Sequence, residues 1–189
     1  PRREFRAGLY EVIKYGMIAN RDLFERVERD LSALFDHNQT ALQPIIAACC
    51  QIKGSIVETD EREAGLRRIL NFGHTVGHAI EAVTKYRRFK HGEAVGYGML
   101  VAADIAERRR TLAPESSKAL SELVAKLGPM PSVTDLSSKQ VIDMINRDKK
   151  IKDGKLHFVL PSSIGTTVVV DDVTTRQINA ALKRLGLRP

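Results

Sequence analysis

Aromatic residues are scarce in this chain of 189 residues, and tryptophan is absent. Aromatic side chains make up 5% of the sequence, and none of the named nucleic-acid-binding motifs occurs in it. The formal net charge is nevertheless +7, with the positive residues spread along the chain apart from the short run at residues 108–110. A small anionic substrate accounts for this charge as well as nucleic acid does, so no nucleic-acid partner is expected.

Cysteines and long apolar runs are also scarce. The two cysteines, Cys49 and Cys50, are neighbours, and neighbouring cysteines rarely pair with each other. No disulfide framework is therefore expected, and the predicted location is the cytoplasm. No apolar run approaches the ~20 residues that cross a bilayer, and no apolar signal segment opens the chain, so no membrane partner is expected.

The third shortage is of phosphate-binding loops. No glycine-rich turn joins a strand to a helix, so the chain is not expected to hold a dinucleotide-binding unit of its own. The sequence opens at Pro1 inside a helical pattern, which indicates a piece of a longer protein whose preceding domain is missing.

Apolar residues make up 43% of the chain, enough for a core, and their spacing is mostly helical. The pattern predicts a single domain over residues 1–189, mainly α, formed by a bundle of about eight helices with a small β-hairpin near residues 155–170. The expected helices span residues 5–17, 21–36, 42–57, 66–85, 91–110, 114–127, 138–148 and 175–185.

The segment at 66–85 carries an unusual polar pattern. Arg67, Asn71, His74 and His78 follow one another at intervals of four, three and four residues, which places them along one face of a continuous helix. A face with a guanidinium, an amide and two imidazoles predicts the wall of a site for an anionic ligand and a metal. Gly73 and Gly77 in the same segment indicate the close approach of either another helix or a ligand.

Histidine spacing supports the metal. His74 and His78 are four residues apart on the expected helix, and His91 supplies a third imidazole from the start of the next one. Spacing does not decide which carboxylate joins them. The candidates are Glu11, Glu63, Glu81 and Glu93. Three ligands with an open position would form a catalytic zinc site.

Several cations are candidates for binding the anion. Arg67 shares a predicted face with His74 and can bind a phosphate or carboxylate through two hydrogen bonds. Taken alone, each of the others resembles a solvated surface charge, and Glu11 and Lys14 resemble a surface ion pair three residues apart. The remaining candidates are Lys14, Lys53, Lys149 and Lys150.

These residues lie in motifs that closely resemble 3-dehydroquinate synthase. The resemblance runs essentially from end to end of the chain and covers the C-terminal, helical domain of that family, without its N-terminal NAD-binding domain. The matching motifs are Arg3-Glu-Phe-Arg-Ala-Gly with Glu11-Val-Ile-Lys14-Tyr-Gly, Asp60-Glu-Arg-Glu63-Ala-Gly-Leu-Arg67, Leu70-Asn-Phe-Gly-His74-Thr-Val-Gly-His78-Ala-Ile-Glu81, His91-Gly-Glu-Ala-Val and Asp148-Lys-Lys-Ile with Phe158-Val-Leu-Pro.

The resemblance implies a metal-dependent cyclase of the shikimate pathway. Such an enzyme converts 3-deoxy-D-arabino-heptulosonate 7-phosphate into 3-dehydroquinate and phosphate. NAD+ oxidises one hydroxyl group transiently, phosphate leaves by β-elimination, and the hydride is returned before the ring opens and closes again. An isolated C-terminal domain would lack the NAD+ site, so it is expected to be inactive.

The resemblance also assigns roles. It implies that Zn2+ or Co2+ is bound by Glu11, His74 and His91, and it makes His78 a substrate contact rather than a ligand. It implies that Glu63 is an active-site carboxylate that helps to hold the polar network. The remaining substrate contacts fall on Lys14, Lys53, Arg67, Asn71 and Lys149, the last in preference to Lys150.

The implied partners are a phosphorylated sugar-acid substrate, the missing NAD-binding domain and a second subunit in a homodimer. Two alternatives stand beside this interpretation. One is a related sugar-phosphate cyclase of the deoxy-inosose synthase type, although the intact motif at residues 71–78 favours dehydroquinate synthase. The other is a non-catalytic module that binds metal and an anion.

Overall fold

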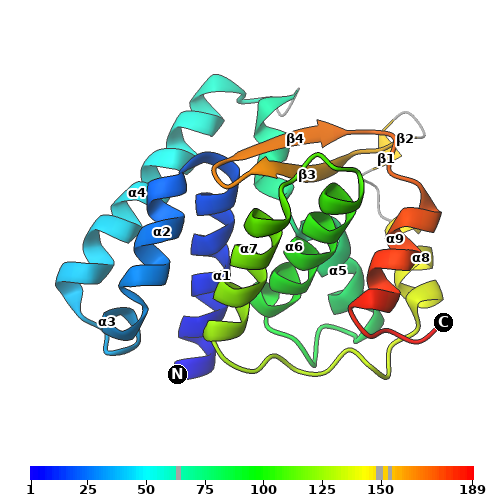
Figure 1. The fold of residues 1–189 in the computed structure, drawn as a ribbon, viewed down its shortest axis with the longest axis horizontal. Coiled ribbons are helices and arrows are strands. Elements are labelled where there is room, and N and C mark those ends of the chain that lie inside the picture. The colour runs from blue at the N-terminus through cyan, green and yellow to red at the C-terminus, as the bar shows by residue number, and fades with distance from the viewer. Residues whose placement is uncertain (63–64, 148–150, 153–154) are drawn as a thin grey trace.

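The computed structural model describes residues 1–62, 65–147, 151–152 and 155–189 and has a mainly α fold (Figure 1). The elements are α1 (Arg2–Ala19), α2 (Arg21–Arg29), α3 (Leu31–Phe35), α4 (Gln39–Thr59), the 3-10 helix η1 (Leu66–Asn71), α5 (His74–Val83), α6 (His91–Arg108), α7 (Pro114–Lys126), α8 (Ser138–Arg147), β1 (Ile151–Lys152), β2 (Lys155–Leu156), β3 (Phe158–Ser163), β4 (Thr166–Val170) and α9 (Thr175–Arg184). The predicted mainly α class is therefore confirmed.

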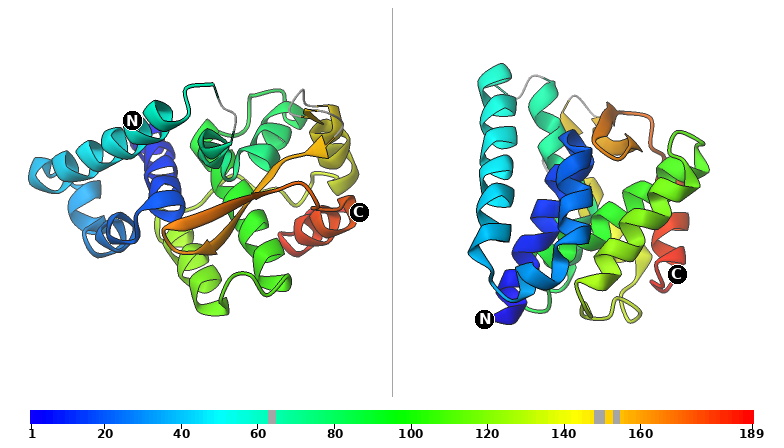
Figure 2. Two further views of the ribbon diagram at one scale, coloured as in Figure 1. Left: turned by 90° about the horizontal axis from the view of Figure 1, so that it is seen from above. Right: turned by 60° about the vertical axis from the view of Figure 1, so that its left-hand side comes forward.

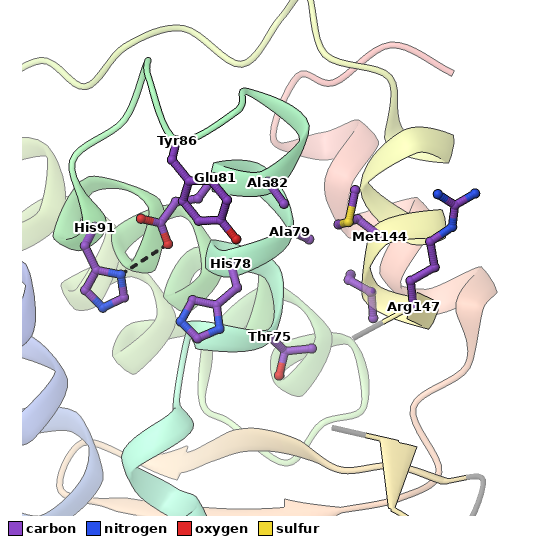
Figure 3. A pocket seen from close by; sticks show the side chains of 10 residues that line it. Thr75, His78, Ala79, Glu81, Ala82, Tyr86, His91, Met144 and Arg147 are labelled. Carbon is purple, nitrogen blue, oxygen red and sulfur yellow. Dashed lines mark hydrogen bonds and ion pairs between the residues drawn. The ribbon is translucent and has the colours of Figure 1, made fainter. Parts of the chain in front are cut away.

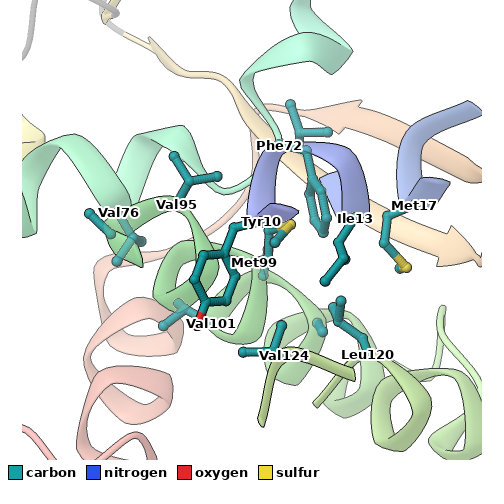
Figure 4. Close-up of a cluster of buried hydrophobic side chains, with 14 of the residues drawn as sticks. Tyr10, Ile13, Met17, Phe72, Val76, Val95, Met99, Val101, Leu120 and Val124 are labelled. Carbon is teal, nitrogen blue, oxygen red and sulfur yellow. The ribbon is translucent and has the colours of Figure 1, made fainter. Parts of the chain in front are cut away.

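Helix α6 is the centre of the bundle. It packs against α1, α5, α7 and α9, while α8 packs on α5 and α9 at one end of the molecule (Figure 1). Figure 4 shows the side chains at the centre of the core, where Ile13 of α1, Phe72 before α5, Met99 of α6 and Leu120 of α7 are fully buried. This core fixes the ends of α5 and α6 that carry the histidines.

Close helix packing explains the glycines of α5 and α6. A methyl group on Gly98 would lie 1.8 Å from the carbonyl oxygen of Gly73, and one on Gly77 would lie 3.1 Å from the backbone of Ala94. The two backbones therefore touch without intervening side chains. Of the two interpretations of Gly73 and Gly77, helix packing is the correct one, because the neighbours of both are α6 atoms.

The predicted hairpin is confirmed as β3 and β4, which pair antiparallel with Val159 opposite Val169. The hairpin lies across the helices, in contact with α1, α6 and η1 (Figure 1). Its turn is attached to α1 where the N–H of Gly165 donates to the carbonyl oxygen of Met17 (3.1 Å). Strands β1 and β2 form a second antiparallel pair.

Two helix predictions were wrong. The segment predicted as a helix at 21–36 is divided between α2 and α3 at Asp30, whose backbone leaves regular helical geometry. The helix predicted at 66–85 is broken into η1 and α5, because Phe72 is non-helical and Gly73 takes a left-handed conformation (φ 78°). These breaks account for the nine α-helices and one 3-10 helix in the described ranges, against about eight predicted.

Helix α4 lies with α2 and α3 on one side of α1 (Figure 2). It begins at Gln39, earlier than predicted, because the Asn38 side chain accepts a hydrogen bond from the N–H of Ala41 (3.2 Å). Helix α4 is long and apolar enough to cross a membrane, contrary to the expectation that no segment is. A single helix of this kind is weak support for a membrane protein. Only 11% of its most apolar stretch is buried, and Ile46 is 56% exposed.

Candidate metal centre and active site

Three imidazoles meet where α5 and α6 begin. His74 is the first residue of α5, His78 lies one turn later, and His91 is the first residue of α6. One ring nitrogen of each lies within 4.8 Å of the others, and the ring centroids are 5.1–5.7 Å apart. Figure 3 shows His78 and His91 side by side at this point. The spacing therefore allows all three side chains to reach one metal ion.

A carboxylate from α1 completes the cluster. Oε1 of Glu11 lies 3.3 Å from Nε2 of His91 and 3.6 Å from Nε2 of His74. This oxygen is buried, yet it has no hydrogen-bond partner of good geometry among the described residues. Unpaired buried oxygens are rare, and one that faces two imidazole nitrogens fits a metal ligand. The residues present therefore fit a divalent cation.

Neighbouring acceptors orient two of the imidazoles. Nδ1 of His74 donates to the carbonyl oxygen of Phe72 (3.0 Å), which accepts hydrogen bonds but cannot donate them. Nδ1 of His91 faces Oε2 of Glu81 at 3.2 Å, the usual arrangement of a metal-ligating histidine and its carboxylate. The carbonyl of Phe72 places the proton of His74 on Nδ1, so its Nε2 points unprotonated toward Glu11, while the ring of His91 lies between the carboxylates of Glu81 and Glu11.

The electrostatics also favour metal binding. Burial, together with the charge of Lys14, lowers the pKa of His74 to about 4, so its ring is neutral at pH 7. Burial raises the pKa of Glu11, but the contact with His91 and the charge of Lys14 outweigh this effect and lower the pKa to about 2. In turn, the contact with Glu11 raises the pKa of His91 despite its partial burial. The cluster thus combines an ionised carboxylate with a neutral imidazole.

The four candidate carboxylates have different surroundings. Glu11 faces the histidines, and Glu81 orients His91 from the outside. Glu93 is paired with Arg3 and with the backbone N–H of Lys90, so it is not directed at the cluster. Glu63 lies outside the described residues. Among the carboxylates described, Glu11 is the one positioned to share an ion with the imidazoles.

Of the cations predicted to bind the anion, the structure places only some next to the histidine cluster. Lys14 is only 4% exposed, and its Nζ lies 2.6 Å from Oε2 of Glu11, so the pair is not the surface ion pair that its spacing suggests. Lys53 is exposed on α4. Lys149 and Lys150 lie outside the described residues.

Arg67 and Asn71 lie on η1 and not on the helix of the histidines, so the prediction of one continuous helical face was wrong. The start of η1 is held by Asp60, whose Oδ2 accepts the N–H groups of Gly65 (2.8 Å) and Arg67 (3.0 Å). The guanidinium of Arg67 donates to the carbonyl oxygen of Glu61 (2.9 Å). These contacts fix η1 against the C-terminal end of α4.

A cavity of about 410 Å3 adjoins the cluster, between α5 and α8 (Figure 3). His78, Glu81 and His91 form one side, and the side chains of Met144 and Arg147 from α8 form the other. Sequence reasoning missed these α8 residues, because neither periodicity nor spacing brings them to α5. The volume is that of a site for a small molecule.

Replacing Glu81 tests the orienting contact. We expect Glu81→Ala to weaken Co2+ binding by about 10- to 100-fold, because His91 would lose the acceptor that fixes its ring. Glu81→Gln, whose amide oxygen still accepts a hydrogen bond, should lose less. Titration of the metal-free chain with Co2+, followed by visible absorption, measures both. Equal affinity in Glu81→Ala and the unaltered chain would contradict the orienting role.

Comparison with known proteins places this site in a family. The family model described as "3-dehydroquinate synthase C-terminal" matches residues 8–151, which include every histidine of the cluster and Glu11. The chain belongs to the 3-dehydroquinate synthase family. Curated relatives include the 3-dehydroquinate synthases of Rippkaea orientalis, 44% identical over 96% of this chain, and of a Nostoc species, 43% identical over 98%. The chain spans about half the length of these relatives.

Solved structures of cyclases share the fold. A 2-epi-5-epi-valiolone synthase from Streptomyces hygroscopicus, with NAD+ and Zn2+ bound, matches 97% of this chain with a TM-score of 0.85 and 28% identity. A 2-deoxy-scyllo-inosose synthase in complex with carbaglucose-6-phosphate, NAD+ and Co2+ matches 97% with a TM-score of 0.80 and 26% identity. The chain spans 51% and 52% of those two proteins. Metal and NAD+ therefore accompany this fold in both neighbours.

Proposed function

We propose that this chain is the metal- and substrate-binding part of a 3-dehydroquinate synthase, which converts 3-deoxy-D-arabino-heptulosonate 7-phosphate into 3-dehydroquinate and phosphate. The observation that carries the proposal is the unpaired, buried Oε1 of Glu11 facing the Nε2 atoms of His74 and His91. Membership of the family and identities of 42–44% to relatives that carry this name support it.

The proposed ligands of Zn2+ or Co2+ are Glu11, His74 and His91. Three protein ligands leave positions open for oxygen atoms of the substrate, as in other catalytic sites of this kind. When bound, the metal would lower the pKa of a substrate hydroxyl group, and NAD+ would supply its reversible oxidation. His78, on the cavity wall, is proposed to contact substrate and not the metal.

The cations of this chain are proposed to bind the acidic groups of the substrate. Lys14 is buried beside Glu11, so its ammonium group is held close to the metal site by a 2.6 Å contact. Arg67 and Asn71 would approach from η1, and Lys53 from α4. We further propose substrate contacts for Glu63 and Lys149. A dianionic phosphate and a carboxylate require several such partners.

The other half of the relatives' length is proposed to be the NAD-binding domain, so the activity belongs to the longer protein. We expect the 189-residue chain to release no phosphate from 3-deoxy-D-arabino-heptulosonate 7-phosphate on its own. A fusion to the NAD-binding half of a relative should release phosphate and depend on both NAD+ and a divalent cation. The measurement is a coupled phosphate assay of both proteins, and the fusion with Glu11→Ala serves as its control.

The structural neighbours support a second candidate, a cyclase acting on another sugar phosphate. The same fusion therefore also receives glucose 6-phosphate, the sugar that carbaglucose-6-phosphate mimics. Turnover of glucose 6-phosphate alone would favour the deoxy-inosose synthase type. A folded, metal-loaded fusion that turns over neither substrate would support the non-catalytic module. A homodimer and a cytoplasmic location remain proposals of the same hypothesis.

A further inference from the structure

A half-buried ion pair joins the first turns of the two helices that supply Glu11 and His91. Arg3, at the start of α1, donates from Nε to Oε1 of Glu93 (2.7 Å) and from Nη2 to Oε2 (2.6 Å). The side chain of Glu93, in the first turn of α6, is only 2% exposed, whereas that of Arg3 is 44% exposed. The carboxylate is thus held inside the protein by two parallel hydrogen bonds, a geometry that only arginine provides.

The same two residues also hold the loop that ends at His91. Nη2 of Arg3 donates to the carbonyl oxygen of Arg88 (2.7 Å), and Oε2 of Glu93 accepts the backbone N–H of Lys90 (2.9 Å). These contacts fix the backbone on both sides of Phe89 and at the start of α6. Arg3, Glu93 and the backbone groups of Arg88 and Lys90 are called the α1–α6 clamp below.

The backbones of α1 and α6 touch directly next to the clamp. A methyl group on Gly92 would lie 1.9 Å from the carbonyl oxygen of Ala7, so the start of α6 touches α1 one turn before Glu11. His91 precedes Gly92 and Glu93 directly in the chain. The position of the His91 backbone relative to α1 is therefore set by contacts at Gly92 and Glu93, not by the imidazole itself.

We propose that Arg3 and Glu93 are positioning residues of the metal site, which hold Glu11 of α1 and His91 of α6 at a separation that one ion can bridge. The proposal rests on the proposed metal site. Neither residue reaches the ion or the cavity, and both act through the two ligands. The contact that they set is the 3.3 Å separation between Oε1 of Glu11 and Nε2 of His91. If the ion pair only stabilised the fold, its loss would lower the unfolding temperature without a specific change in Co2+ affinity or absorption bands.

The chain offers a matched control on the same helix. Arg184 of α9 also binds a carboxylate of α6 through two hydrogen bonds, with Nε of Arg184 donating to Oδ1 of Asp104 (2.8 Å). Asp104 lies toward the C-terminal end of α6, far along the helix from His91. The side chain of Arg184 is 39% exposed, close to the value for Arg3. Loss of either arginine removes one bidentate pair from α6, but only Arg3 lies beside the ligands.

The experiment compares Arg3→Lys and Arg3→Gln with Arg184→Lys and Arg184→Gln. Each metal-free chain is titrated with Co2+ while the visible absorption bands are recorded, and its thermal unfolding is followed in the presence of chelator. We expect Arg3→Gln to weaken Co2+ binding by about 10- to 100-fold and to change the bands, with partial recovery in Arg3→Lys. The Arg184 variants should keep the affinity and bands of the unaltered chain, even where their unfolding temperatures fall.

Three results would overturn the inference. The first is unchanged Co2+ affinity and unchanged bands in both Arg3 variants. The second is an equal loss of affinity in the Arg184 variants, which would indicate a general effect of stability. The third is an unaltered chain that takes up no Co2+, which refutes the metal site itself and therefore also the clamp. If Arg3→Gln does not fold, the Co2+ affinity and bands of Arg3→Lys test the inference instead, because lysine keeps the charge but loses the bidentate geometry.

Discussion

Replacement of His91 by alanine is expected to abolish stoichiometric metal binding, whereas replacement of His78 should leave it intact. His91 and His74 both direct Nε2 at the unpaired Oε1 of Glu11, and both have their Nδ1 atoms engaged by an acceptor. Loss of a direct ligand should exceed the roughly 10- to 100-fold effect of losing an orienting partner, so we expect Co2+ affinity to fall by more than about 100-fold. The measurement is zinc content after purification without chelator, together with Co2+ titration.

His78→Ala is the matched control, since His78 is a third imidazole within 4.8 Å of the other two. It lies one turn after His74 and, like His91, lines the cavity, so its replacement removes the same imidazole volume from the cavity wall. If His78→Ala loses zinc as completely as His91→Ala, the pair four residues apart on α5 is the metal site and the ligand set Glu11, His74 and His91 is wrong. If only His91→Ala loses it, His78 is not a ligand, which supports its proposed contact with substrate.

Periodicity predicted the elements of the fold well where a helix has one apolar face. The segments at 114–127 and 175–185 have that pattern, and α7 and α9 confirm them, while the helix predicted at 91–110 is confirmed as α6, which is covered by other helices on several sides. The pattern was misleading between residues 66 and 85, because polar residues at helical spacing do not reveal a left-handed glycine. Gly73 adopts φ 78° where its backbone meets Val95 and Met99 of α6, a tertiary contact that local sequence does not encode.

The candidate site was predictable only in part for a similar reason. His74 and His78 can be paired by their spacing, but nothing in the sequence pattern connects them with Glu11, which is 63 residues earlier in the chain. That connection requires α1 and α5 to pack on α6, so it came from the family motifs and not from spacing. Glu81 was one of four equivalent carboxylates in the sequence, and its contact with His91 distinguishes it only in three dimensions.

The packing of α6 also explains why the metal site and the core are connected. Gly73, which ends the non-helical link before His74, lies directly against Gly98. The first turn of α5 is therefore positioned by a contact between two backbones deep in the bundle. A change at Gly98 would move the backbone that carries His74, although Gly98 itself lies on α6, two turns after His91.

Apart from Gly92 beside the α1–α6 clamp, Gly98 is the helical glycine whose replacement by alanine is expected to lower the stability most. The new methyl carbon would lie 1.8 Å from the carbonyl oxygen of Gly73 and 2.7 Å from its carbonyl carbon, and neither backbone atom can rotate away. We expect the free energy of unfolding to fall by about 3 kcal/mol, the upper part of the usual range for overpacked cores. The midpoint of urea unfolding of the metal-free chain measures this loss.

Gly54→Ala is the control, because a methyl group there would have no atom within 4 Å. Gly54 lies inside α4, where alanine is favoured over glycine by about 1 kcal/mol, so this variant should be slightly more stable than the unaltered chain. Opposite signs for the same glycine-to-alanine change would establish that α5 and α6 touch through their backbones. An unchanged midpoint in Gly98→Ala would show instead that the two helices are farther apart, and the position of His74 would then need another explanation.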